Sequence, residues 1–194
     1  MREFVDQSEL ENVRDPIGEM LAALGDHMRQ YDAVCEARGW LSEERVQHEA
    51  SLSEIEEGDL EGLPDAYVAE LGRSALGLYL VDQKLSVVGR KLTEIAQASE
   101  SIDTRGLLGK KVGVFSNDPE RYTLGTSRKN QYGQYDGLSK WYPNRHGVVT
   151  DINTHPGQGG WMRISARSGR FYSATPLVDR HNDYQPAFTI EATR

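Results

Sequence analysis

Cysteine and long apolar runs are the first things this sequence lacks. The 194 residues contain one cysteine, Cys35, which excludes an intramolecular disulfide and any metal finger built on several cysteines. No apolar run approaches the ~18 residues that a membrane-spanning helix needs, so no membrane partner is expected. The opening residues, from Met1 to Asp6, contain no apolar signal segment either.

Basic and aromatic residues are scarce in the first half of the chain. Residues 1–102 hold 9 Lys+Arg against 22 Asp+Glu and 5 of the 16 aromatic residues, whereas residues 103–194 hold 13 Lys+Arg against 8 Asp+Glu and the other 11. We therefore predict an acidic, coiled-coil-like helical region at 1–102 and a basic, aromatic-rich small β-barrel domain at 103–194. The two charges indicate either different partners or halves that neutralise each other, within the chain or between subunits.

The first predicted helix starts at Asp15-Pro16, where Asp can cap and Pro fits the first helical position. Its apolar stripe predicts an end near Gly39, which can supply a left-handed cap. The stripe consists of Ile17, Leu21, Leu24, Met28, Tyr31 and Cys35. Cys35 is therefore expected to be a buried thiol. The carboxylates of residues 54–61 are expected to form a solvated face, because they lack the spacing of an EF-hand loop.

Two sevenfold series of apolar residues mark a longer helix, from Pro64 to about Ser101. Together they form the a and d positions of a coiled coil, which Ser74 and Ser99 interrupt. We expect this seam to pack against residues 17–35 of its own chain, against other copies, or against both. The candidate assembly residues are Leu71, Leu78, Leu85 and Leu92 in one series and Val81, Val88 and Ile95 in the other. A basic-zipper DNA binder is excluded, because the residues before Leu71 are acidic.

Short alternating segments and tight turns predict five strands in the second half, at residues 109–115, 147–153, 161–167, 170–174 and 186–193. In the order of these elements the region resembles an SH3-like barrel. The predicted fold class is thus α+β, with an N-terminal α-helical hairpin or coiled coil before a small antiparallel SH3-like β-barrel. The resemblance implies binding of peptides, nucleic acid or neighbouring subunits, and it lowers the expectation of catalysis.

The stretch from Ser116 to Arg145 interleaves basic and aromatic residues, which can pair with phosphate and stack bases or anchor a protein interface. The alternative is that Tyr122 and Trp141 merely cover the open end of the barrel. The candidate partner-binding residues are Arg128, Lys129, Tyr132, Tyr135, Trp141, Tyr142 and Arg145.

No catalytic constellation stands out. Residues 106–111 lack the spacing and the Ser/Thr of a phosphate-binding loop. Asp179, His181 and Asp183 alternate as metal ligands on a strand would, but their polar surroundings favour a solvated loop. We expect no enzyme activity, no cofactor and no metal.

The leading hypothesis is a non-enzymatic structural protein, such as a bacteriophage virion component, located in the cytoplasm or the virion. Its helices would assemble copies into a homo-oligomer or a larger assembly, and its barrel would contact a neighbouring protein. One alternative is a nucleic-acid-associated regulator that binds phosphates through the basic domain. Another is an inhibitor whose acidic half mimics DNA.

Overall fold

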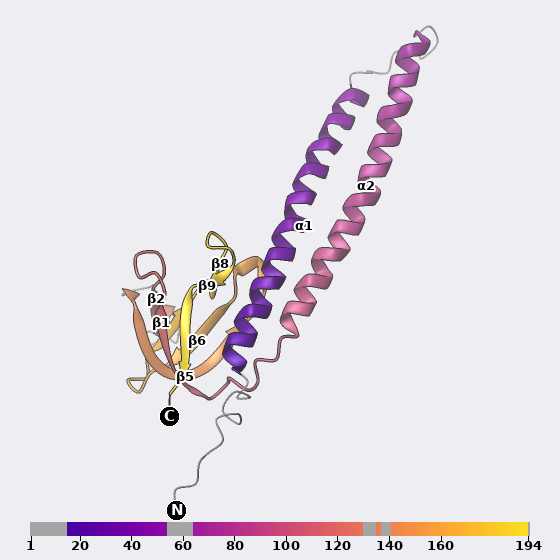
Figure 1. The fold of residues 1–194 in the computed structure, drawn as a ribbon. Coiled ribbons are helices and arrows are strands. Elements are labelled where there is room, and N and C mark those ends of the chain that lie inside the picture. Colours follow the sequence, from indigo (N-terminus) through magenta and orange to yellow (C-terminus); the bar gives the residue numbers. More distant parts are fainter. Residues whose placement is uncertain (1–14, 54–63, 130–134, 137–140, 194) are drawn as a thin grey trace, which may run out of the picture. The chain divides into compact units, whose positions relative to one another are not determined.

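The computed structural model describes residues 15–53, 64–129, 135–136 and 141–193 (Figure 1). The fold is α+β, since two helices precede a mostly antiparallel sheet. The chain divides into two compact units. The helical arm comprises residues 30–96, and the sheet unit combines the residues up to Arg29 with residues 97–194. The predicted boundary near residue 102 stays a prediction.

The helical arm is built from α1 (Pro16–Ser53) and α2 (Asp65–Glu100), which run side by side in opposite directions (Figure 1). Arg45 Nε of α1 lies 3.3 Å from the Asp82 carboxylate of α2. The His48 imidazole fills the space that a side chain at Gly77 would need, so this glycine permits a close approach of the helices. In the residues that the structure describes, neither helix has a stretch long and apolar enough to cross a membrane.

The predicted end of the first helix at Gly39 is wrong, because α1 continues to Ser53. A glycine inside a helix costs only about 1 kcal/mol relative to alanine, and pairing with α2 around Arg45 offsets that cost. The prediction for Cys35 is also wrong, because this cysteine is exposed.

The first turns of α1 belong to the core of the sheet unit. They contribute five buried side chains, Ile17, Met20, Leu21, Leu24 and Met28, to one cluster with the inward-facing residues of the strands. At the start of the helix, the Asp15 carboxylate accepts a hydrogen bond from the Ile17 amide, which satisfies one free N–H of the first turn. The predicted apolar stripe thus lies against the sheet over residues 17–28, and the contacts of α1 with α2 in the arm come later in the helix.

The described residues of the sheet unit form ten strands. They are β1 (Lys111–Ser116), β2 (Leu124–Lys129), β3 (Tyr135–Asp136), β4 (Trp141–Tyr142), β5 (Asn144–Asn153), β6 (Trp161–Ser165), β7 (Phe171–Ala174), β8 (Val178–Asp179), β9 (Gln185–Pro186) and β10 (Phe188–Ala192). A 3₁₀ turn, η2 (Pro156–Gln158), links β5 to β6. The order in the main sheet is β10-β1-β5-β6-β7-β2-β3, with β4 paired to β2, and β8 and β9 form a separate hairpin.

This sheet is not closed into a barrel. In the described part of the chain, β10 at one end of the order pairs only with β1, and β3 at the other end pairs only with β2. The predicted closed SH3-like barrel is therefore not confirmed. Alternation along the strands buries Val112 and Val114 on the inner face and leaves Lys111 and Phe115 on the outer face.

Ser99, which interrupts the predicted apolar seam, is fully buried in the sheet unit. Its hydroxyl donates to the Thr154 carbonyl, and the Thr154 hydroxyl donates to the Ser99 carbonyl at 2.7 Å. The pair ties the last turn of α2 to the chain that follows β5. A polar residue at this seam position is thus explained by a reciprocal hydrogen bond.

Candidate functional site

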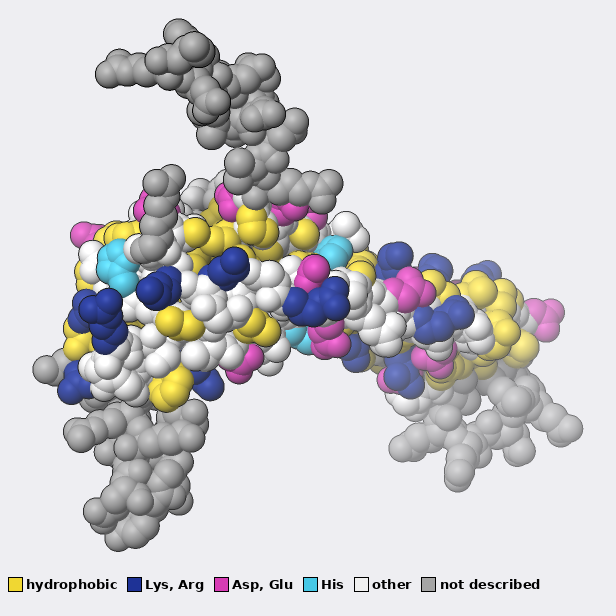
Figure 2. Space-filling model, turned by 90° about the horizontal axis from the view of Figure 1, so that it is seen from below, with side chains coloured by type: hydrophobic (Ala, Val, Ile, Leu, Met, Phe, Trp, Pro, Cys, Tyr) yellow, Lys and Arg dark blue, Asp and Glu magenta, His cyan; other side chains and the backbone are white. Residues whose placement is uncertain are grey.

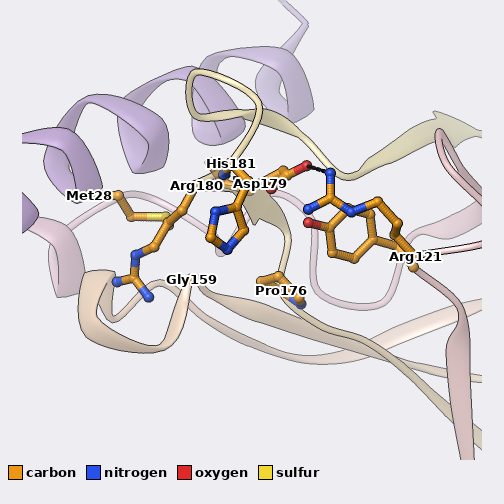
Figure 3. Close-up of a pocket in the computed structure, with 9 residues that line it drawn as sticks. Met28, Arg121, Gly159, Pro176, Asp179, Arg180 and His181 are labelled. Carbon is orange, nitrogen blue, oxygen red and sulfur yellow. Dashed lines mark hydrogen bonds and ion pairs between the residues drawn. The ribbon is translucent and has the colours of Figure 1, made fainter.

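A pocket with a volume of about 480 Å³ lies beside the β8–β9 hairpin of the sheet unit (Figure 3). Met28 of α1 and Gly159, just after η2, form one side of it, and Arg121 with Tyr122 forms another. The hairpin contributes Val178, Asp179, Arg180 and His181, and Pro176 completes the lining. The pocket thus joins segments from four separate parts of the sequence.

Asp179 is the buried charge of this pocket, with a side chain only 6% exposed. One of its carboxylate oxygens lies 3.5 Å from Arg121 Nη1, and the other accepts a hydrogen bond of 2.9 Å from the His181 amide. Burial by itself raises the pKa of Asp179. Hydrogen bonds from Tyr122 and the His181 amide, with the positive charge of Arg121, outweigh burial and lower that pKa below its usual value.

Hydrogen bonds also hold the side chains of Tyr122 and Arg180 beside Asp179. Burial, followed by the hydrogen bond to Asp179, raises the pKa of Tyr122, so that this phenol stays protonated. Arg180 donates to the carbonyls of Pro156 and Gly157, at 2.8 and 3.3 Å, and so connects the hairpin to η2. Among the described residues that line the pocket there is no serine, threonine or cysteine. These contacts hold the Asp179 side chain in place and favour its charged, carboxylate form.

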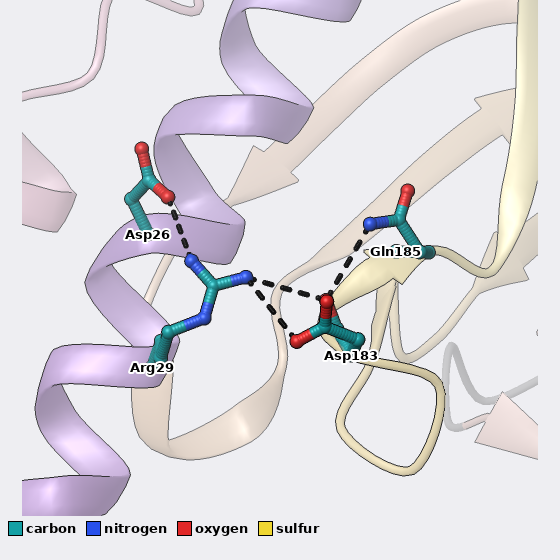
Figure 4. A network of polar contacts seen from close by, with 4 residues as sticks. All are labelled: Asp26, Arg29, Asp183 and Gln185. Carbon is teal, nitrogen blue, oxygen red and sulfur yellow. Dashed lines mark hydrogen bonds and ion pairs between the residues drawn. The ribbon is translucent and has the colours of Figure 1, made fainter.

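A second network holds the tip of the same hairpin on α1 (Figure 4). Arg29 donates to Asp26 at 3.1 Å and to the backbone carbonyl of Asp183 at 3.3 Å, and its guanidinium stacks over the Tyr184 ring at 5.1 Å. Asp183 and Tyr184 have φ angles of 45° and 58°, which non-glycine residues rarely adopt. The Gln185 side chain also donates to the Asp183 carbonyl. The contacts with Arg29 hold the turn in this uncommon conformation.

The stability contributed by Asp179 is expected to depend on pH. Because its folded pKa is depressed, this contribution is present above the unfolded pKa of about 3.9 and is lost as the pH falls through the lower folded value. We expect Asp179→Asn to lower the free energy of unfolding by about 1–3 kcal/mol at pH 7, and by less at about pH 3. Urea unfolding at both pH values measures this, with Asp151→Asn at an exposed position as control. A gap between Asp179→Asn and the wild type that is constant with pH would refute the prediction.

Asp179, His181 and Asp183 were predicted to lie in a solvated loop. The side chains of His181 and Asp183 are exposed, but that of Asp179 is buried. In the part of the chain that the structure describes, no three His, Cys, Asp or Glu side chains gather as a metal site would require.

Of the predicted partner-binding residues, the structure brings Tyr142 and Arg145 together. The Arg145 guanidinium lies 3.3 Å from the centre of the Tyr142 ring and 5.4 Å from that of Tyr172, and the two tyrosine rings meet edge to face. Arg145 faces Val114 across the β1–β5 ladder, on the inner side of the sheet. These two residues therefore close one end of the core. Tyr122 packs on Phe188 of the core.

The other predicted partner-binding residues are placed by the backbone alone. Arg128 and Lys129 lie on β2, Tyr135 lies opposite Lys129 on β3, and Trp141 lies on β4. Their side chains, and Tyr132 as a whole, fall outside the described residues, as do the carboxylates of residues 54–61.

The predicted assembly residues form the least exposed face of α2. Val81, Leu92 and Ile95 are buried, together with Ser74 of the same seam. The other four, Leu71, Leu78, Leu85 and Val88, are half-buried. Their part in assembly stays a prediction.

A second apolar face of α2 was not predicted from the sequence. Large hydrophobic side chains are exposed on it, among them Leu76, Tyr79, Leu80 and Val87. Yellow hydrophobic side chains are visible on the surface of the arm in Figure 2. The signal was present in the sequence, because these residues recur at helical spacing outside the heptad positions.

Comparisons with known proteins identify no relative. No family model, no curated protein and no solved structure matches this chain.

Proposed function

We propose that the protein is a non-enzymatic assembly protein, in which the exposed apolar face of α2 packs against the same face of a second copy. The observation that carries this proposal is the exposure of Leu76, Tyr79 and Val87, which are 58%, 59% and 54% exposed on an ordered helix. Contiguous apolar surface of this kind marks an interaction site in soluble proteins.

The apolar face is well defined on the helix. At ~100° per residue, the exposed hydrophobic residues from Val68 to Val87 fall within an arc of about 120°, centred opposite the seam. Within this arc and range no residue is charged. We call this set the α2 strip; its members are Val68, Ala69, Gly72, Leu76, Tyr79, Leu80, Gln83, Ser86 and Val87. The strip is about 30 Å long.

The charges at the ends of the α2 strip favour an antiparallel pair of copies. Asp65 precedes the strip and Arg90 follows it, both close to its centre line and both exposed. In an antiparallel pair, Asp65 of each copy meets Arg90 of the other, and Leu76 meets Tyr79. A parallel pair would instead place Asp65 against Asp65 and Arg90 against Arg90. The strip is therefore self-complementary, as an interface with twofold symmetry must be.

The expected affinity is moderate. A pair of helix faces of this length is small compared with the ~800 Å² per partner of stable complexes, so we expect dissociation constants in the micromolar range. Such contacts suit an assembly in which many copies are held close together, which supports the predicted structural role, including that of a virion component. We also propose that the sheet unit is related in architecture to an SH3-like barrel. It is supported by β4, which directly precedes β5 and pairs with β2.

Sedimentation of the full chain, from about 1 to about 200 µM, tests the proposal. We expect the mass to rise from monomer to dimer with concentration, and Leu76→Glu with Leu80→Glu to weaken association at least about tenfold, because charge enters the apolar contact. The matched control is Val46→Glu with Ala50→Glu, which places two charges at the same spacing on an exposed part of α1. A monomer throughout, or equal weakening by both double variants, would overturn the proposal.

The orientation has its own test. With Cys35→Ser as background, and with Asp65 and Arg90 left in place, a chain carrying Ala69→Cys and Ser86→Cys on the exposed α2 strip should form disulfides between position 69 of one copy and position 86 of the other. Mass spectrometry of the cross-linked peptides distinguishes this from links between identical positions. Links only between identical positions would refute the antiparallel arrangement and leave association itself standing.

A further inference from the structure

The outer face of the sheet carries a shallow groove of about 720 Å³ across β1, β5 and β6. Three cationic or titratable side chains line it, Lys111 from β1, His146 from β5 and Arg167 just after β6. The hydroxyls of Thr150, Ser165 and Thr193 also face it, and none of the described residues that line it is acidic. In Figure 2, basic and histidine side chains lie close together on the sheet unit, at the left of that view.

We infer that this groove binds single-stranded nucleic acid, with backbone phosphates at Lys111 and Arg167 and a base stacked on His146. A cationic groove without carboxylates attracts a polyanion, and hydroxyls donate hydrogen bonds to phosphate oxygens. The inference does not depend on the assembly proposed for α2.

Aromatic rings accompany the charges, as this class of ligand requires. The Phe115 and His146 rings meet edge to face, 5.4 Å apart. Both lie over Gly113, where a side chain would collide with either ring. Phe171 faces Ser165 across the β6–β7 ladder, so a third ring borders the groove on the same side of the sheet. Phe115 and Phe171 are half-buried and His146 is exposed, which leaves ring surface for stacking.

A single strand fits this face better than a duplex does. Stacking on rings that lie on a sheet needs unpaired bases, which a duplex holds inside its own stack. Glu191 and Asp151 occupy the outer face opposite Gly113 and Arg163, outside the groove lining. We expect the bound nucleic-acid strand to avoid these two carboxylates, because they repel its phosphates.

From the sequence alone, contacts with nucleic acid were expected within residues 116–145. None of these residues is among the described residues that line the groove, and His146 is the next residue along the chain. Lys111, His146 and Arg167 are far apart in the sequence. The ladder registers bring them together, because Lys111 lies opposite Val148 on β5, and Val148 lies opposite Ser165 on β6.

Fluorescence anisotropy of labelled oligo-dT, oligo-rU and a duplex of the same length, titrated with the full chain at several salt concentrations, tests the inference. We expect micromolar binding of the single strands at about 50 mM salt and weaker binding of the duplex. Lys111→Glu with Arg167→Glu should weaken single-strand binding at least about tenfold and reduce the salt dependence by about two phosphate contacts. His146→Ala should weaken binding and leave the salt dependence unchanged, because it removes stacking alone.

The matched control is Lys110→Glu with Arg105→Glu, which makes the same change in charge at exposed positions outside the groove. It should change single-strand affinity far less than the groove variant. Absence of single-strand binding by the wild type at low salt, equal losses in both double variants, or a duplex bound as tightly as the single strands would each overturn the inference.

Discussion

A chain of residues 103–194 alone is expected to remain unfolded, although it contains every strand of the sheet. Five core side chains of the sheet unit come from α1, and Leu24 and Met28 are fully buried there. At Gly160 the chain has no side chain, and a Cβ there would collide with Leu24. Full burial of each large apolar side chain stabilises a protein by roughly 1.5–3 kcal/mol. Losing five of them therefore removes about 10 kcal/mol, as much as the whole stability of a typical domain.

Circular dichroism and urea unfolding of residues 103–194 and of the full chain measure this effect. The full chain should unfold cooperatively, and the shorter chain should show no cooperative transition. A full chain with Leu24→Asp is the second variant, because it damages the same contact without deleting residues. The exposed Ala22→Asp, two residues earlier on α1, is its control. A cooperative transition in residues 103–194 would instead support the predicted domain boundary near residue 102.

Much of the fold could be predicted because the relevant patterns are local. Alternation marked the segments that became β1, β5, β6, β7 and β10, and helical spacing marked α2. Strands β2, β3 and β4 have no comparable alternation, and the sequence therefore gave no sign of them within residues 116–145. The end of α1 was misplaced because Gly39 is an ordinary helix terminator, whereas pairing with α2 is a tertiary contact that no local pattern reports.

The candidate sites were harder to predict, because they depend on the register of the strands. Arg121 and Asp179 are 58 residues apart in the sequence and form an ion pair only through the path of the chain around the core. Tyr142 and Arg145 were each predicted to contact a partner, whereas the structure stacks them on one another and the ladder turns Arg145 to the inner side of the sheet. Residue composition indicated a basic, aromatic domain, but only the fold separates rings that fill the core from rings on the outer face.

A buried charge in the interior of the helical arm is expected to destabilise the arm. Val81 is the most completely buried hydrophobic residue of the α2 seam, at 1% exposed. We expect Val81→Asp to destabilise the arm by more than about 3 kcal/mol, because a carboxylate there would be buried without a partner. The measurement is the helical signal at 222 nm during urea unfolding of the full chain. A large part of that signal should be lost at lower urea than in the wild type.

The control for this prediction is the neighbouring residue, Leu80, which lies on the exposed face of α2. Leu80 is 47% exposed, so Leu80→Asp makes the same chemical change in the same turn without burying the charge. It should leave the helical signal within about 0.5 kcal/mol of wild-type stability and, under the proposed assembly, weaken association between copies. Equal loss of helix in Val81→Asp and Leu80→Asp would show that the two faces of α2 do not differ as the structure places them. Wild-type stability in Val81→Asp would show that the seam is not the interior of the arm.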